Sequence, residues 1–248
     1  AAPILIRSQT STATLFSSRL GLLSFSYFYK DLKNIFFPVQ GLYLASDSVA
    51  ASWGFPTRAG YDLTSYDNSP EATVQGYEID LQTNLSSLDS FLRGVVISAN
   101  ITRQFSETTK YNFATKDSLV GIIRGRPVFE TLVVKTSRQI DIPGQTPMIF
   151  NLSLGYDYKG FSGRVSGNYQ SEYLVVPGQS EVRDVSNGEF WRWDVALKQQ
   201  INENLTANFS ISNLTGMREE TYRNFDPRYP GSISHYGAIT NFGIQWRW

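Results

Sequence analysis

Apolar and polar residues alternate along this chain in one short segment after another, and this pattern constrains the fold more than any other feature. Along 161–173, apolar Val165 and Tyr169 fall on one face of an extended strand, and polar Arg164 and Asn168 fall on the other. Side chains alternate between the two faces of a strand with a period of two residues. The sequence therefore predicts an all-β protein whose sheet has one apolar and one polar face.

Eight segments follow this pattern well, and a weaker ninth lies at 4–14. The eight are predicted as strands at 23–30, 77–85, 95–102, 151–158, 161–173, 191–201, 205–212 and 241–248. Short connections at 86–92, 159–160 and 202–204 alternate with long ones at about 32–70, 106–146, 174–189 and 213–235. Alternate connections of an antiparallel sheet lie at the same end. This asymmetry is therefore expected for an outer-membrane β-barrel with tight periplasmic turns and long extracellular loops.

Strand length and aromatic placement separate a membrane barrel from a soluble β-sandwich, which also alternates its faces. Several segments run for about 10 residues or more, whereas soluble strands typically run for about 5–6. Such lengths suit tilted strands that cross an apolar band of about 25 Å. Aromatic residues gather near the strand ends, as expected for rings at the two membrane interfaces. The predicted interface aromatics are Tyr156, Tyr158, Tyr173, Trp191, Trp193, Trp246 and Trp248.

Composition excludes several other classes of protein. The chain has 22 Lys and Arg residues against 22 Asp and Glu residues, so no excess of positive charge points to nucleic acid. It has no cysteine and one histidine, which excludes disulfides and zinc clusters built from thiolates or several histidines. No apolar run reaches the roughly 18 residues of a membrane-spanning helix. No cofactor is expected.

Five blocks of sequence resemble the C-terminal barrel of TonB-dependent receptors, particularly the Bacteroidota type. They are SPEATVQGYEIDLQTNL (69–85), GVVISANITRQFSET (94–108), IPGQTPMIFNLSLGYDYKGFSGRVSGNYQSEYL (142–174), FWRWDVALKQQINENLTANFSISNLTG (190–216) and YGAITNFGIQWRW (236–248). Their order and spacing also match, so the resemblance covers roughly 19–248. The chain departs from the family by ending on Trp248 instead of the usual Phe, which should still serve as the aromatic signal for the barrel-assembly machinery.

The resemblance implies a 22-stranded barrel occluded by an N-terminal plug domain, which couples to the TonB complex. Residues 1–248 are then expected to be the C-terminal portion of the barrel domain, contributing eight or nine strands, with the plug and the earlier strands absent. The family imports scarce nutrients across the bacterial outer membrane, driven through TonB by the proton motive force. The expected partners of this chain are outer-membrane lipid, the TonB complex and a transported small molecule or oligomer.

Charged residues on the polar face are expected to line a hydrated lumen and to seat the plug. They are Glu78, Asp80, Arg164, Asp194, Lys198 and Arg247. Glu78 and Asp80 form a carboxylate pair that could instead serve acid/base chemistry or bind a cation. The simpler interpretation is that opposite charges pair in a wet lumen, where each pair contributes about 0.2–1 kcal/mol.

Aromatic residues and arginines in the long loops are candidates for ligand capture. They are Tyr43, Trp53, Arg58, Tyr61, Arg223, Arg228, Tyr229 and His235. Such residues suit an anionic or aromatic ligand such as a metal chelate, and they could equally serve only to pack the loops together. A hydrolase would have to use His235, the single histidine, yet no nucleophile-elbow pattern precedes it.

Three functional hypotheses remain open. The first is TonB-dependent import of a metal–siderophore, vitamin, glycan or peptide, without catalysis. The second is a complete eight-stranded outer-membrane barrel with a structural or adhesive role, because eight strands can close around a core of side chains. The third is a surface enzyme built on a barrel. Counting the strands and finding whether the sheet closes separates the first hypothesis from the second.

Overall fold

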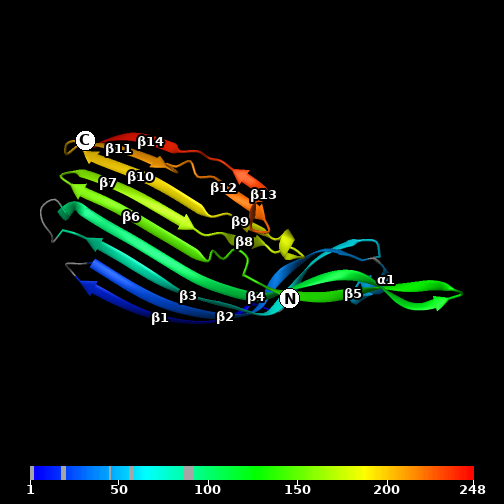
Figure 1. The fold of residues 1–248 in the computed structure, drawn as a ribbon. Coiled ribbons are helices and arrows are strands. Elements are labelled where there is room, and N and C mark those ends of the chain that lie inside the picture. The colour runs from blue at the N-terminus through cyan, green and yellow to red at the C-terminus, as the bar shows by residue number, and fades with distance from the viewer. Residues whose placement is uncertain (1–2, 18–20, 45, 56–58, 87–91) are drawn as a thin grey trace. The chain divides into compact units, whose positions relative to one another are not determined.

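The computed structural model describes residues 3–17, 21–44, 46–55, 59–86 and 92–248, and these are mostly β-strands (Figure 1). One sheet contains β1 (Leu5–Ser17), β2 (Gly21–Tyr43), β3 (Asp62–Asn84), β4 (Val95–Ile123), β5 (Arg126–Ile140), β6 (Met148–Tyr158), β7 (Phe161–Gln170), β10 (Phe190–Gln200), β11 (Leu205–Ser212) and β14 (Ile239–Trp246). A second sheet contains β8 (Tyr173–Val176), β9 (Val185–Asn187), β12 (Glu219–Arg223) and β13 (Asp226–Ser234).

Among the described residues, helical structure is confined to short pieces. They are α1 (Asp47–Ser52) and the 3₁₀ turns η1 (Leu92–Gly94) and η2 (Glu181–Arg183). Within the described ranges, no helix is long and apolar enough to cross a membrane. The expectation of an all-β chain is confirmed.

Neighbouring strands of the first sheet follow the order β1-β2-β3-β4-β6-β7-β10-β11-β14, and β5 pairs with β4. The nine strands of this path correspond to the nine predicted segments. The weak segment at 4–14 is confirmed as β1, whose Thr12 and Thr14 hydroxyls lie 2.9 and 3.1 Å from those of Ser26 and Ser24 on β2. Strands β1 and β14 are the two edges of the path, so the described strands do not close into an eight-stranded barrel.

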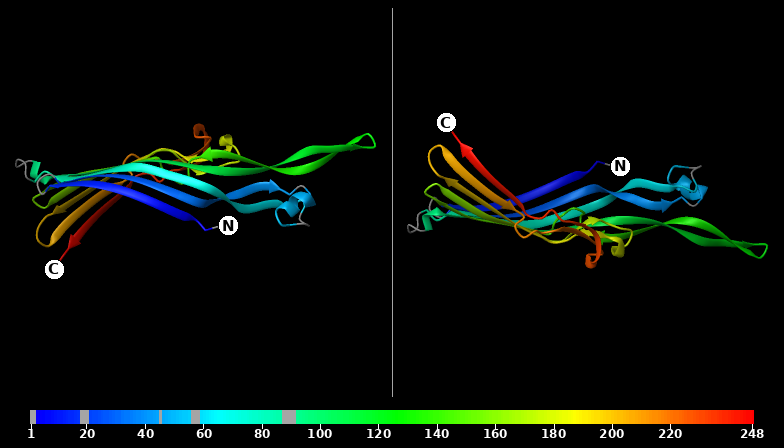
Figure 2. Two further views of the ribbon diagram at one scale, coloured as in Figure 1. Left: turned by 90° about the horizontal axis from the view of Figure 1, so that it is seen from below. Right: turned by 90° about the horizontal axis from the view of Figure 1, so that it is seen from above.

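The chain divides into two compact units. Unit 1 comprises Ala1–Arg7, Asp31–Thr73 and Glu107–Asp141, and unit 2 comprises Ser8–Lys30, Val74–Ser106 and Ile142–Trp248. We call the main sheet of unit 2 the wall. It contains the unit 2 parts of β1 to β4 together with β6, β7, β10, β11 and β14. In Figure 2 the two edge strands of the wall run at an angle to each other, because β-sheets twist.

The register of the wall places apolar residues opposite apolar residues. Leu154 lies opposite Val165 on β7, and Val165 lies opposite Val195 on β10. The exposed fractions of Leu154 and Val165 are 46% and 41%, so this face packs against no other layer of the described chain. The opposite face carries polar side chains, such as Asn151 opposite Asn168. The predicted division into an apolar and a polar face is confirmed.

The tight connection between β6 and β7 has the expected conformation. Lys159 and Gly160 have φ angles of 44° and 80°, and Tyr158 pairs with Phe161 across the turn. Two successive residues with positive φ are the signature of a type I′ turn, whose twist matches that of the flanking strands. The turn at 202–204 is closed differently, because the Asn202 side-chain oxygen accepts from the backbone N–H groups of Asn204 and Leu205.

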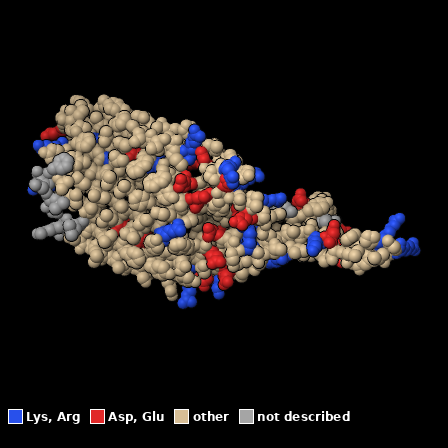
Figure 3. Space-filling model, in the orientation of Figure 1, with Lys and Arg blue, Asp and Glu red and all other residues tan. Residues whose placement is uncertain are grey.

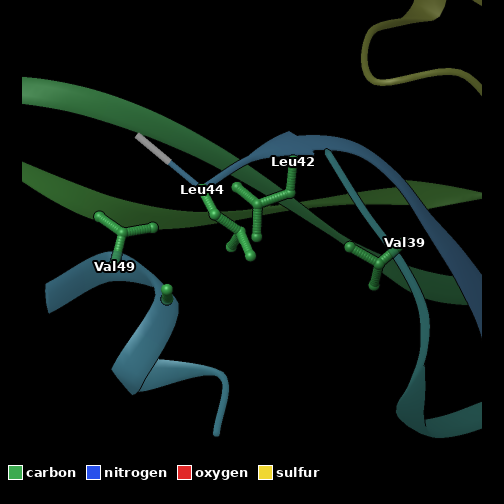
Figure 4. Packing of buried hydrophobic residues seen from close by; sticks show 5 residues of the cluster. Val39, Leu42, Leu44 and Val49 are labelled. Carbon is green, nitrogen blue, oxygen red and sulfur yellow. The ribbon is translucent and has the colours of Figure 1, made fainter. Parts of the chain in front are cut away.

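The segments 32–70 and 106–146 were expected to be loops, and this expectation is wrong. They contain the far parts of β2, β3 and β4, the whole of β5, and α1. These elements form unit 1 around a hydrophobic cluster of Val39, Leu42, Leu44, Val49 and Ala50 (Figure 4). Trp53, Leu63, Phe113 and Val133 pack against this cluster. The Ser46 hydroxyl caps α1 by accepting from the Val49 N–H at 3.3 Å.

The segments 174–189 and 213–235 also contain strands instead of only loops. They form the four-stranded sheet in the order β13-β12-β9-β8. The strand predicted at 161–173 ends at Gln170, and Tyr173 begins β8, which pairs with β9. Glu172 lies at this break and accepts from the hydroxyl of Ser186, which is fully buried on β9. The chain therefore leaves the wall three residues earlier than the alternation indicated.

Candidate functional site

The polar face of the wall carries two successive rows of hydroxyl and amide side chains. Ser98, Ser153, Ser166 and Asp194 lie opposite one another across four neighbouring strands, and the next row is Asn100, Asn151, Asn168 and Arg192. Adjacent strands are joined by the Ser166–Ser153 hydroxyl contact at 3.2 Å and by the Asn168 amide, which donates to the Asn151 oxygen at 2.7 Å. Most of these side chains line a hollow of about 240 Å³.

Glu78 and Asp80 meet at one end of these rows. The Asn100 side-chain amide donates to Glu78 Oε1 at 3.0 Å and also to Asp80 Oδ1. The two carboxylates are thus bridged by a neutral donor on the adjacent strand. In the part of the chain that the structure describes, no group of three or more His, Cys, Asp or Glu side chains could hold a metal ion. Hydrogen bonding to Asn100 on the polar face accounts for the pair, and the prediction that it faces a lumen stays a prediction.

Arg164 and Lys198 lie nearer the tight-turn end of the same face. The Arg164 guanidinium donates to both oxygens of Asp157, at 2.9 and 2.6 Å. Lys198 lies opposite Ser162 on β7 and Asn208 on β11. Arg164 and Lys198 both line a second hollow of about 360 Å³. Arg247 lies just beyond β14, where its backbone N–H donates to Asn204 O at 2.8 Å.

Asp194 connects the polar face to the long connection after β11. Its Oδ1 accepts from the backbone N–H of Asn213 at 2.8 Å, and its other oxygen lies 3.5 Å from Arg192. The Asn213 side chain donates to Met217 O at 3.1 Å and to Gly237 O at 3.0 Å, and it accepts from the Met217 N–H at 2.9 Å. The Asn213 side chain therefore hydrogen-bonds to residues near both ends of the segment 213–237.

The sequence analysis placed Asn213 at the start of the long connection 213–235 and missed this role. Its φ is +53°, a left-handed conformation that Asn adopts more readily than most residues. The available signal was an Asn placed directly after the alternating segment 205–212.

The loop candidates of unit 1 differ in their surroundings. Tyr43 and Tyr61 are 50% and 58% exposed. Trp53 is partly buried against the hydrophobic cluster and meets the edge of Phe113 with ring centroids 4.9 Å apart. Arg58 lies outside the described residues. The position of Trp53 favours a packing role for that residue, and ligand contact by the others stays a prediction.

The loop candidates of unit 2 lie in or beside the second sheet. Arg223 ends β12, Arg228 and Tyr229 lie on β13, and His235 follows β13. Arg228 forms an ion pair with Asp226 whose shortest contact is 2.6 Å, and this pairing lowers the pKa of the Asp226 carboxyl. Tyr229 is 58% exposed. Capture of a ligand by these residues also stays a prediction.

Tyr222 on β12 is held in a polar contact close to these candidates. Its hydroxyl donates to Glu220, and this hydrogen bond, aided by partial burial, raises the pKa of Tyr222 to about 12. The phenol therefore remains a neutral donor at physiological pH.

Aromatic side chains on the apolar face form two groups. Near the long-loop end, Phe150, Tyr169 and Trp191 lie opposite one another, with the Trp191 ring 4.6 Å from Tyr169 and 6.5 Å from Phe150. Trp193 stacks beside Trp191 at 6.2 Å. Near the tight-turn end, the Tyr156 and Tyr158 rings lie 6.2 Å apart. Trp246 and Trp248 are exposed at that end.

These two groups have the spacing of membrane-interface belts. Tyr169 and Phe161 lie eight residues apart on β7, which is about 27 Å along the strand and about 20 Å along the membrane normal at a tilt near 40°. Figure 3 shows one face of the molecule on which charged side chains are scarce over much of the surface and crowd into particular regions. Phe150 and Tyr169 were not among the expected belt residues, because only the register reveals that they share a level with Trp191.

Comparisons with known proteins agree with this geometry. The profile of a family described as "TonB dependent receptor-like, beta-barrel" matches residues 8–214. The pyoverdine outer membrane receptor FpvA from Pseudomonas aeruginosa PAO1, bound to pyoverdine, superposes with a TM-score of 0.56 at 15% identity, over 98% of this chain and 30% of that one. A ferric enterobactin receptor (PfeA) mutant from the same species gives 0.54 at 13% identity, over 97% and 30%.

A third similar structure is that of the FpvAI–pyocin S2 complex, with a TM-score of 0.57 at 15% identity, over 97% of this chain and 27% of that one. At such identities these likenesses concern the fold alone. The chain spans less than a third of the length of the solved structures that it matches. A comparison with curated protein sequences found no match.

Proposed function

The chain belongs to the TonB-dependent receptor-like β-barrel family of bacterial outer-membrane proteins, and from this premise we propose that it forms part of the wall and outer loops of an active nutrient importer. The family consists of transporters and receptors, which are not enzymes. The observation that carries the proposal is the two-faced wall, with an aromatic-edged apolar face and a face of paired hydroxyl, amide and charged groups. The first of these faces suits lipid and the second a hydrated lumen.

The polar face suits passage of a hydrated solute. Its hydroxyl and amide groups are already paired with one another across strands, as Ser166 is with Ser153 and Asn168 with Asn151. Each group can still form further hydrogen bonds, so a polar cargo can exchange partners without leaving a buried polar group unsatisfied. In this mechanism the outer segments capture the cargo, and the N-terminal plug moves when the TonB complex acts on it. The six charged lumen candidates would contact that plug.

A metal chelate is the substrate class that we favour. The names of two similar structures refer to pyoverdine and to ferric enterobactin. Unit 1 also has a cation among aromatic rings: Lys135 Nζ lies 3.6 Å from the Tyr111 ring centroid and 5.2 Å from that of Phe113, and it forms an exposed ion pair with Asp67 at 3.3 Å that an anionic ligand would have to share or displace. Such a cluster can bind an anionic, ring-containing ligand. Vitamins, glycans and peptides are the other classes that we consider.

The orientation follows from the connections. We propose that the tight turns at 159–160 and 202–204 face the periplasm, and that the long connections at the other ends of the wall strands lie on the extracellular side. This choice agrees with the usual asymmetry of outer-membrane barrels. The exposed Trp246 and Trp248 would then lie at the periplasmic interface, where the assembly machinery meets the last strand.

Uptake measurements test the importer. Cells that depend on this protein should accumulate a radiolabelled ferric chelate, and a protonophore or loss of TonB should abolish accumulation while leaving binding at the cell surface intact. A strain in which Lys135 is replaced by Gln should bind the chelate more weakly, whereas K116Q, on the same hairpin, serves as the matched control. Accumulation that persists without TonB would refute active import.

A further inference from the structure

One arginine of the wall lies on the apolar face. On β4, Ile101, Arg103 and Phe105 share the face opposite to Asn100, and Arg103 lies opposite Met148 on β6. Ile101 lies opposite Phe150, so Arg103 is one position further along this face than the row of Phe150, Tyr169 and Trp191. Two residues advance about 7 Å along a strand, or about 5 Å along the normal of the membrane at a tilt near 40°. Arg103 is thereby placed at the level of lipid headgroups just outside the hydrocarbon.

The Arg103 guanidinium makes no hydrogen bond or ion pair with any described residue. It stacks on the ring of Phe105, whose centroid lies 4.7 Å from Arg103 Cζ, and it lies within electrostatic range of Tyr169, whose hydroxyl hydrogen-bonds to Glu189. Phe105 is 51% exposed, so the stacked pair stands at the surface of the wall. Stacking fixes the plane of the guanidinium and leaves its N–H groups available to an acceptor.

The arginines of the polar face have different surroundings. Arg164 donates to both oxygens of Asp157, and Arg192 lies 3.5 Å from an oxygen of Asp194. On that face the protein supplies the carboxylate. On the lipid face the nearby carboxylate, Glu189, is hydrogen-bonded by the Tyr169 hydroxyl, and at headgroup level the phosphate of a lipid is a further anion that Arg103 can bind. A planar guanidinium matches phosphate oxygens with two parallel hydrogen bonds.

We propose that Arg103, stacked on Phe105, is a binding site for the phosphate group of a lipid in the outer leaflet of the outer membrane. Gly76 on β3 lies directly against the backbone of Arg103, so Gln75 and Tyr77 flank the site on the neighbouring strand. The Tyr27 hydroxyl donates to Gln75 Oε1 at 3.2 Å, which adds a polar pair to this region. The assignment to the outer leaflet rests on the orientation in the proposed function, whereas recognition of a lipid phosphate does not.

Lipid retention by the purified protein tests the site. The wild type, R103Q, R103K and the control R192Q would be extracted from outer membranes in a mild detergent, and bound phosphorylated glycolipid would be counted by native mass spectrometry. R103Q should retain at least about tenfold less, the factor equivalent to 1.4 kcal/mol. R103K should fall between, because it keeps the charge and loses the planar fork. R192Q, on the polar face, should match the wild type.

A second measurement distinguishes a lipid phosphate from free inorganic phosphate and checks that each variant is folded. Each protein in nanodiscs would be titrated with the intact glycolipid, with its enzymatically dephosphorylated form, and with inorganic phosphate. The site is supported if only the intact lipid binds and R103Q removes this binding while keeping the wild-type resistance to SDS unfolding. Equal binding by R103Q, or equal binding of the dephosphorylated lipid, would overturn the site. Uptake of the ferric chelate in the same strains reports on the importer separately, because the lipid titration does not depend on transport.

Discussion

Replacing Asn213 with Ala should release the segment 214–237 from the wall without unfolding the wall itself. The Asn213 side chain forms three hydrogen bonds, to Met217 O, Gly237 O and the Met217 N–H, at 2.9 to 3.1 Å. Each contributes about 1 kcal/mol net. Ala at a φ of +53° adds roughly 1 kcal/mol of backbone strain. Water can replace part of the hydrogen bonding at this half-buried position, so we expect a net cost of about 2–3 kcal/mol.

Hydrogen–deuterium exchange measures this cost locally. Amides that exchange through opening of 214–237 should do so about 30- to 150-fold faster in N213A, because each 1.36 kcal/mol is a factor of ten. Amides of β7 (161–170) should keep their wild-type rates. N213G separates the two contributions, since Gly accepts a positive φ without strain; its exchange should be several-fold slower than that of N213A. Wild-type rates in 214–237, or equal acceleration in β7, would refute the anchoring role.

Four further substitutions test other parts of the molecule. Leu42 is 1% exposed in the cluster of unit 1, so L42A should destabilise unit 1 by about 2–5 kcal/mol. Limited proteolysis should then cleave unit 1 faster and cleave the wall at the wild-type rate. Wild-type cleavage of unit 1 in L42A would contradict a separate core. Val165 lies midway between the aromatic groups on the apolar face, so V165R should lower the folding free energy in lipid by about 2–4 kcal/mol in refolding titrations. S166R, on the polar face, should fold like the wild type. Arg228 lowers the pKa of Asp226, so in acid the unfolded hairpin binds more protons than the folded one. The pairing therefore stabilises β12–β13 above the ordinary carboxyl pKa, and this stabilisation is lost as pH falls through the lowered value. After correction for the intrinsic exchange rate, R228Q should lose this pH-dependent part of the protection factors in 219–234.

The wall could be predicted from the sequence because each of its strands has one face toward apolar surroundings and one toward polar groups. Val165 and Leu154 meet across two strands on one face, and Asn151 and Asn168 meet on the other. Period-two alternation is the direct consequence of this environment. Even the weak segment at 4–14 proved to be a strand, since Thr12 and Thr14 supply its polar face.

Unit 1 could not be predicted in the same way, because its strands do not separate apolar from polar faces. On β5, Val133 packs against the hydrophobic cluster while its neighbours Leu132 and Val134 are 45% and 37% exposed. Three consecutive apolar residues give no period of two. On β2, Phe37 is buried, and Phe36 on the other face meets the edge of Tyr66 at 5.6 Å. Such runs resemble irregular loops when only the sequence is available.

The partners of the candidate site residues depend on register, which alternation alone leaves open. The sequence placed Glu78 and Asp80 on the polar face, and only the pairing of strands shows that the Asn100 amide bridges them. A shift of one residue would reverse every face, while a shift of two would keep the faces and change each neighbour. Face assignments were therefore predictable, and individual contacts were not.

Arg103 interrupts the alternation of apolar and polar residues, because a charged residue lies on the apolar face of β4. A charged residue follows Ile97, Ala99 and Ile101 on the same face of β4, at the end where the aromatic group lies. A charge that faces lipid without a partner is costly, and Arg103 forms no ion pair with any described residue, so a lipid phosphate can supply the missing anion. Arg164 and Arg192, on the other face, have carboxylates of their own. The two faces thus differ in which partner satisfies an arginine, and this difference is what R103Q and R192Q compare.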